Sequence, residues 1–74
     1  MRLPNGFIGA PSREEGGPIY IINVSHIAAY WPQWDESADI CIGCFIRMAS
    51  GGGFETSLLP DELDSGILAA QGSK

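Results

Sequence analysis

Positive charge is scarce in this sequence. Its 74 residues include four Lys and Arg against nine Asp and Glu, which gives a formal net charge of -5. The basic residues are far apart along the chain: Arg2, Arg13, Arg47 and Lys74. Affinity for nucleic acid comes mostly from neutralising phosphates with Lys and Arg. The composition therefore argues against direct binding to nucleic acid and favours a basic protein surface as partner.

Long apolar segments are also lacking. No run approaches the ~20 apolar residues that span a membrane. Residues 1–6 lack the apolar stretch of a signal peptide. We therefore expect a cytoplasmic protein that does not enter membranes, and two cysteines that stay reduced.

Residues that commonly carry chemistry are few. His26 is the single histidine, and no nucleophile motif accompanies it. We interpret His26 as a polar residue at a strand bend rather than as a general base. The sequence predicts a protein that is not an enzyme, with no catalytic residue, no metal site and no cofactor.

The two cysteines form the pattern Cys41-Ile42-Gly43-Cys44. A redox pair with this spacing works at the start of a helix, whose terminus lowers the pKa of the first thiol. Here the pair lies in an expected strand, where residues three apart point to opposite faces. Two cysteines and a distant histidine also do not complete a four-ligand zinc site. We expect Cys44 in the core and Cys41 at the surface or rim.

Glycine and proline are abundant, with ten and five residues, which favours short strands joined by turns. The run Gly51-Gly52-Gly53 could suggest a phosphate loop. Such a loop needs a following helix with Lys and Ser or Thr, whereas residues 54–58 are typical of a strand. We predict a hairpin turn with positive φ at more than one glycine.

The remaining strand signals lie between residues 19 and 48. Residues 19–24 are almost all β-branched or aromatic and predict a buried strand. After a bend at residues 25–26, residues 27–31 continue extended, with Pro32 at an edge or a strand end. Residues 40–48 predict a strand with one apolar face, formed by Ile40, Ile42, Cys44, Ile46 and Met48.

A short helix is expected after the last strand. Pro60 suits the first helical position, and Leu63, Ile67 and Ala70 form an apolar stripe at helical spacing. Gly72 is the expected stop.

The ends of the chain differ in character. Residues 1–18 are rich in Gly and Pro, and we expect a loosely docked N-terminal arm. Residues 19–72 are expected to form a single domain. The predicted fold is α+β: a small antiparallel meander of three to four strands with one short C-terminal helix.

Two acidic groups and one aromatic group are the candidate binding residues. The acidic groups are Asp35, Glu36 and Asp39 in a polar connection, and Asp61, Glu62 and Asp64 at the start of the helix. The aromatic group comprises Trp31, Trp34 and Phe45, together with Tyr30.

Each group has a plain structural interpretation and a functional one. The first acidic group lacks the pattern of a calcium loop, so it is either a solvated surface or a contact for basic residues. The second also complements the positive end of a helix. The aromatic residues either close the open end of the sheet or form an exposed protein-binding hot spot.

Two segments carry a resemblance to known proteins. Residues 21–30 (IINVSHIAAY), the glycine hairpin and residues 54–63 (FETSLLPDEL) resemble a widespread class of small bacterial and phage proteins. That class has a strand reading INVxxIxxI, a glycine hairpin, and a closing strand that runs into a helix with an acidic first turn. The resemblance covers residues 19–70 and implies a fold rather than an activity. This sequence departs from the class at Pro60, where an acidic helix opening is usual, and in its Gly- and Pro-rich arm.

A small acidic chain of this kind also resembles phage-encoded anti-CRISPR proteins. Several of those inhibitors cover the basic surface with which a surveillance complex binds target DNA. No motif allows functional residues to be carried over. The resemblance implies an inhibitor that binds a CRISPR effector subunit, in the cytoplasm of the host cell if the protein is phage-encoded.

The leading hypothesis is therefore a non-enzymatic inhibitor that binds a basic groove on a protein that handles nucleic acid. The alternative is a structural or regulatory module of phage or bacterial origin, either a monomer or a homodimer formed by pairing of edge strands.

Overall fold

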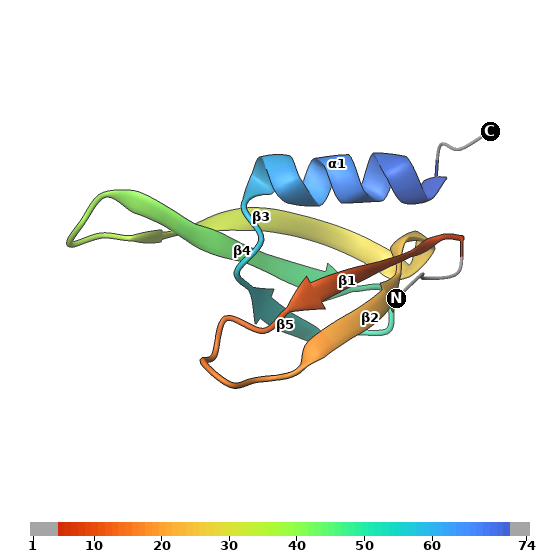
Figure 1. Cartoon of the computed structure of the whole chain (residues 1–74), viewed down its shortest axis with the longest axis horizontal. Coiled ribbons are helices and arrows are strands. Elements are labelled where there is room, and N and C mark those ends of the chain that lie inside the picture. The colour runs from red at the N-terminus through yellow and green to blue at the C-terminus, as the bar shows by residue number, and fades with distance from the viewer. Residues whose placement is uncertain (1–4, 72–74) are drawn as a thin grey trace.

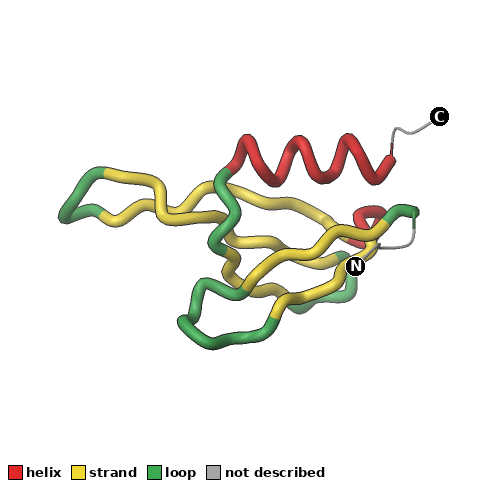
Figure 2. The backbone as a smooth tube through the Cα atoms, in the orientation of Figure 1, coloured by secondary structure: helices red, strands yellow, loops and turns green. Residues whose placement is uncertain are grey.

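A computed structural model describes residues 5–71 of the chain. The elements follow one another as β1 (Phe7–Pro11), β2 (Ile19–Asn23), the 3-10 helix η1 (Val24–His26), β3 (Ile27–Asp35), β4 (Ile40–Met48), β5 (Gly53–Thr56) and α1 (Pro60–Gln71). Strands β1 and β2 form one antiparallel sheet, and β3, β4 and β5 form a second antiparallel sheet in meander order (Figures 1 and 2). The predicted α+β fold with a C-terminal helix is confirmed.

Strand β1 lies in the segment for which we expected a loosely docked arm. It pairs along its whole length with β2, from Phe7 opposite Asn23 to Pro11 opposite Ile19. Ile8 and Ala10 point into the core and are 7% and 0% exposed. The sequence did not predict this strand, because Gly and Pro are unfavourable in strands and both are frequent in this segment. Pairing with β2 and burial of two side chains stabilise it nonetheless.

The two sheets meet where β1 ends beside β5. Ser12 and Thr56 form an isolated bridge, and the Ser57 amide donates to the Pro11 carbonyl at 3.2 Å. The buried Thr56 hydroxyl donates to the same carbonyl at 2.8 Å. These bonds hold the sheets on either side of a common core.

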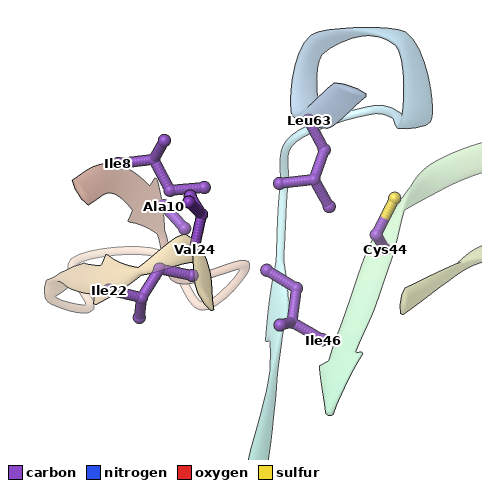
Figure 3. Close-up of a cluster of buried hydrophobic side chains, with 7 residues drawn as sticks. All are labelled: Ile8, Ala10, Ile22, Val24, Cys44, Ile46 and Leu63. Atoms are coloured by element: carbon purple, nitrogen blue, oxygen red, sulfur yellow. The ribbon is translucent and has the colours of Figure 1, made fainter. Parts of the chain in front are cut away.

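The core draws on both sheets and the helix. Figure 3 shows side chains from β1, β2 and η1 facing those from β4 and α1. The fully or nearly buried apolar residues are Ile8, Ala10, Ile22, Val24, Cys44, Ile46 and Leu63.

An irregularity in β4 changes which residues face this core. Gln33 pairs with Gly43 and Trp34 with Cys41, so Ile42 has no partner on β3. Gly43 has φ +142°, and a Cβ there would lie 2.0 Å from the Thr56 carbonyl oxygen. Only glycine fits this position. The prediction of one apolar face over residues 40–48 is correct for the second half of the strand and wrong before the bulge, where Ile40 is 54% exposed.

Two tight connections, a bend and a hairpin turn, occur where the sequence predicts them. Residues 24–26 form the bend as a 3-10 turn, with the Ser25 amide donating to the Asn23 side chain. The glycine run forms the β4–β5 hairpin, in which the Met48 amide donates to the Gly52 carbonyl at 2.7 Å. Only Gly51 of the three glycines has positive φ, at +108°, so the expectation of several such positions is wrong.

Helix α1 begins at Pro60, as predicted. The Glu62 carboxylate accepts a hydrogen bond from the Leu59 amide at 2.9 Å, which satisfies a donor that the first helical turn leaves unpaired. Leu63 is fully buried, and Ile67 and Ala70 pack against the core. The expected stop at Gly72 lies outside the described residues.

Candidate protein-binding surfaces

Strand β3 divides the aromatic residues between two faces of its sheet. Tyr30 packs against the core and its hydroxyl donates to Asp64 of α1. Because successive residues of a strand point to opposite faces, Trp31 lies on the face turned away from α1. There it stacks on Phe45, its cross-strand partner, with ring centroids 5.2 Å apart and planes at 20°.

Trp34 does not join this stack. It follows Trp31 by three residues, so alternation places it on the same side of β3 as Tyr30 and α1. Its side chain is 57% exposed, against 43% for Trp31. The three aromatic residues that the sequence grouped as anchors therefore belong to two different surfaces.

The first acidic group lies around the β3–β4 turn. This hairpin projects to one end of the long axis of the molecule (Figure 1). Asp35 accepts hydrogen bonds from the Ser37 hydroxyl at 2.8 Å and the Ser37 amide at 3.1 Å. The bond from the Ser37 side chain, followed by that from its backbone, lowers the pKa of Asp35 below its ordinary value. Hydrogen bonds to the ionised form thus keep this carboxylate charged.

The second acidic group lies on the first turns of α1, at the end of the helix nearer the hairpin tip (Figure 1). Two of its members have roles within the fold, since Glu62 caps the helix and Asp64 accepts the Tyr30 hydroxyl. The hydrogen bond to Asp64 is the main cause of a raised pKa of Tyr30, with burial and the Asp64 charge adding to it. Asp61 is exposed.

The hairpin tip and the start of α1 lie toward the same end of the molecule (Figure 1). We call these two groups together with Trp34 the acidic side, although Asp35 follows Trp34 on β3 and by alternation points to the other face of the sheet. Its residues are Trp34, Asp35, Glu36, Asp39, Asp61, Glu62 and Asp64. No Lys or Arg occurs in β3, in the turn that follows it or in α1. Within residues 5–71 the basic side chains are Arg13 and Arg47 alone, and neither belongs to these elements of the acidic side.

Arg13 is engaged inside the fold. Its guanidinium lies 3.5 Å from the Glu55 carboxylate. It also donates to the Gln33 side chain and to the carbonyls of Cys44, at 3.3 Å, and Thr56, at 3.4 Å. One side chain from the β1–β2 connection thereby joins β3, β4 and β5. This role could not be predicted from the sequence, because Arg13 is close to none of its partners along the chain.

Arg47 lies on the face turned away from α1. It alternates with the buried Ile46 on β4, as does Phe45. We call this surface the outer face and define it by Trp31, Phe45, Arg47 and Glu55. A hollow of about 420 Å³ on it is lined by Trp31, Phe45, Arg47 and the three glycines of the hairpin.

A second hollow, of about 410 Å³, lies between β1 and α1. Its lining residues are mostly small or apolar, with Glu62 as the charged member: Asn5, Gly6, Phe7, Ile8, Gly9, Leu58, Glu62, Leu63, Gly66, Ala69 and Ala70.

The cysteines differ from expectation in one respect. The bulge at Ile42 places Cys41 opposite Trp34 and Cys44 opposite Pro32, so both lie on the same side of the sheet and the expected opposite orientation is wrong. Cys44 is fully buried, as predicted, and burial is the main cause of its raised pKa. The Cys41 thiol is half-buried and donates to the Gly43 carbonyl at 3.3 Å. A buried thiol with a raised pKa is a poor nucleophile.

His26 lies at the bend, as expected, exposed at the end of η1. Its carbonyl accepts a hydrogen bond from the Ala49 amide at 2.6 Å. Across residues 5–71, no group of three or more His, Cys, Asp or Glu is placed to hold a metal ion.

Comparison of the chain with protein-family models, with curated proteins and with solved structures gave no match. In the part of the chain that the structure describes, no helix has the length and apolar character needed to cross a membrane. A functional assignment therefore depends on the geometry and charge of the surfaces above.

Proposed function

We propose that this protein acts by binding, and that its acidic side covers a basic surface on a partner protein that handles nucleic acid. The observation that carries the proposal is the charge distribution. Six of the nine carboxylates lie at the end of β3, in the turn that follows it and on the first turns of α1, and β3, this turn and α1 contain no Lys or Arg. A surface of one sign steers a partner of the opposite sign and fixes its orientation.

Trp34 supplies the apolar part of this surface. It is 57% exposed, immediately precedes Asp35, and shares the α1 side of the sheet with Tyr30. Exposed tryptophans surrounded by charged residues are frequent energetic centres of protein interfaces. Trp31 and Phe45 lie on the other face and have no part in this contact.

A protein that covers a basic groove competes with the phosphates that the groove binds, so it acts as an inhibitor without a chemical step. A CRISPR effector subunit is the concrete partner that we propose, in keeping with the resemblance to anti-CRISPR proteins. Other basic grooves on nucleic-acid-binding proteins belong to the same class.

The test is affinity capture from a lysate of the host, with identification of bound proteins by mass spectrometry. The matched control is the triple variant Glu36→Gln, Asp39→Asn, Asp61→Asn. These substitutions remove three charges at nearly constant shape, and no side-chain hydrogen bond within residues 5–71 depends on them. Asp35, Glu62 and Asp64 are retained because each stabilises a local structure.

The proposal predicts that the wild type retains a nucleic-acid-binding protein which high salt elutes, since exposed charges are screened. The triple variant and Trp34→Ala should retain less of it. Equal recovery with wild-type and triple-variant baits would contradict the role of the acidic side.

A further inference from the structure

The outer face leaves an aromatic surface uncovered in the described chain. Trp31 is 43% exposed although it stacks on Phe45, and α1 lies on the opposite side of the sheet. The Phe45 ring lies close over Gly53, where a Cβ would be 2.7 Å from two ring carbons. The strand β5 thus presents no side chain at that position, and the Phe45 ring covers it. An exposed aromatic surface on a sheet is suited to pack against another sheet.

This face differs in charge from the acidic side. Arg47 and Glu55 both lie on it, and both are exposed. In the strand register Phe45 is opposite Glu55 and Arg47 is opposite Gly53. Arg47 and Glu55 therefore occupy the two ends of a diagonal across adjacent strands, with Phe45 and Gly53 on the other diagonal.

We propose that the outer face binds a second copy of this chain and forms a two-fold symmetric dimer. The two-fold axis runs parallel to the sheet, between the two outer faces, and passes over the centre of that diagonal. It places Arg47 of each copy over Glu55 of the other. The two aromatic stacks then share the centre of the interface. Such isologous pairing requires a surface that is complementary to itself, and one cation and one anion placed across a two-fold axis satisfy this condition.

The charge of the whole chain explains why this face meets a second copy rather than another part of the surface. At a net charge of -5, two copies repel one another. Contact through the acidic side would place like charges together. The outer face combines an aromatic centre with the exposed cation Arg47. Two copies can therefore meet there without placing like charges together. Glu55 is further oriented by its contact of 3.5 Å with Arg13 in its own chain.

The dimer is independent of the proposed partner binding. Trp34 and the α1 carboxylates lie on the other side of the sheet, so pairing of the outer faces leaves an acidic side accessible on each copy. A dimer would then present two such surfaces.

The test is sedimentation equilibrium of the purified chain over a range of concentrations, which requires no knowledge of the partner. Wild type should dimerise. Arg47→Glu should raise the dissociation constant of the dimer by about tenfold or more, because it puts two pairs of like charges across the interface. Trp31→Ala should weaken the dimer, whereas Trp34→Ala should leave its dissociation constant unchanged.

A mixing experiment distinguishes loss of the dimer contact from poor folding of a variant. Glu55→Lys alone should also dimerise more weakly than the wild type, for the same reason of like charge. Mixed with Arg47→Glu at equal concentration, it should form a heterodimer, because each reversed charge then faces an opposite one. A wild-type chain that remains monomeric would overturn the proposal. So would a dimer that is insensitive to Arg47→Glu, or a mixture that fails to associate.

Discussion

The hydroxyl of Tyr30 donates a hydrogen bond to the carboxylate of Asp64, 34 residues further along the chain. This contact joins β3 to the first turns of α1. Leu63, the neighbour of Asp64, is fully buried against the sheet. Near its N-terminus the helix is therefore held by the buried Leu63 side chain and, one residue further on, by the Tyr30–Asp64 hydrogen bond. That arrangement fixes where the α1 carboxylates lie relative to the hairpin.

The Tyr30–Asp64 bond predicts a pH-dependent stability. Tyr30→Phe removes the donor and should lower the free energy of unfolding by about 0.5–1 kcal/mol near neutral pH. The pKa of Tyr30 is raised in the folded protein above its ordinary value of 10.0. Its contribution is therefore fully present below pH 10.0 and is lost as the pH rises through the raised value. Urea unfolding of both proteins on either side of pH 10.0 should show a difference that shrinks in alkali; a constant difference would contradict this role.

Gly43 should be the least replaceable glycine in the described chain. Gly43→Ala puts a Cβ against the Thr56 carbonyl and forces a side chain to adopt φ +142°. We expect a loss of about 2–4 kcal/mol in the free energy of unfolding. Gly52→Ala is the matched control, because a Cβ there has no atom within 4 Å and its φ is not in the left-handed region. Thermal denaturation should separate the two variants clearly, and similar melting temperatures would show that β4 relaxes around the new methyl group.

Much of the fold could be predicted from the sequence because its signals are local. β-branched residues over 19–24, the glycine hairpin and Pro60 each specify an element through neighbouring residues. Strand β1 could not be predicted this way, since its stability comes from pairing with β2 and burial beneath α1. The bulge at Ile42 likewise lies beside a close approach between Gly43 and Thr56, which are remote in sequence. If regular alternation is assumed along β4, residues 40–42 are assigned to the wrong faces of the sheet.

The candidate site was partly predictable for the same reason. The acidic residues could be identified from the sequence, and the structure adds that the hairpin tip and the start of α1 lie toward the same end of the molecule (Figure 1). The separation of Trp31 from Trp34 follows from strand alternation alone, but only if the strand continues beyond Pro32. Proline at an edge position permits that continuation, and β3 is an edge strand of its sheet.

Arg13 should contribute more to the free energy of unfolding than other residues of the β1–β2 connection. Arg13→Ala removes the link between β3, β4 and β5 and leaves the carbonyls of Cys44 and Thr56 without this donor. We expect a loss of about 1–3 kcal/mol. Glu15→Ala, an exposed residue of the same connection, should change stability by less than about 0.5 kcal/mol. Chemical denaturation measures both, and equal effects would mean that the guanidinium contacts contribute nothing.

Ser37 should control the ionisation of Asp35. Ser37→Ala removes the hydroxyl that is the main cause of the lowered pKa of Asp35, so that pKa should rise towards its ordinary value. A depressed carboxyl pKa stabilises the fold above the unfolded value, and the effect is lost as the pH falls through the folded value. Carbon-detected NMR titration of the Asp35 carboxyl group follows this directly. An Asp35 pKa that is the same in both proteins would exclude the Ser37 hydroxyl as the main cause.

The central claim is that the carboxylates of the acidic side bring the protein to a basic partner. Its most direct test is the association rate constant with the captured partner, for the wild type and for the Glu36→Gln, Asp39→Asn, Asp61→Asn variant, at low and high salt. We predict that the wild type associates several-fold faster than the variant at low salt, and that high salt removes most of the difference. Equal association rates at low salt would contradict the claim.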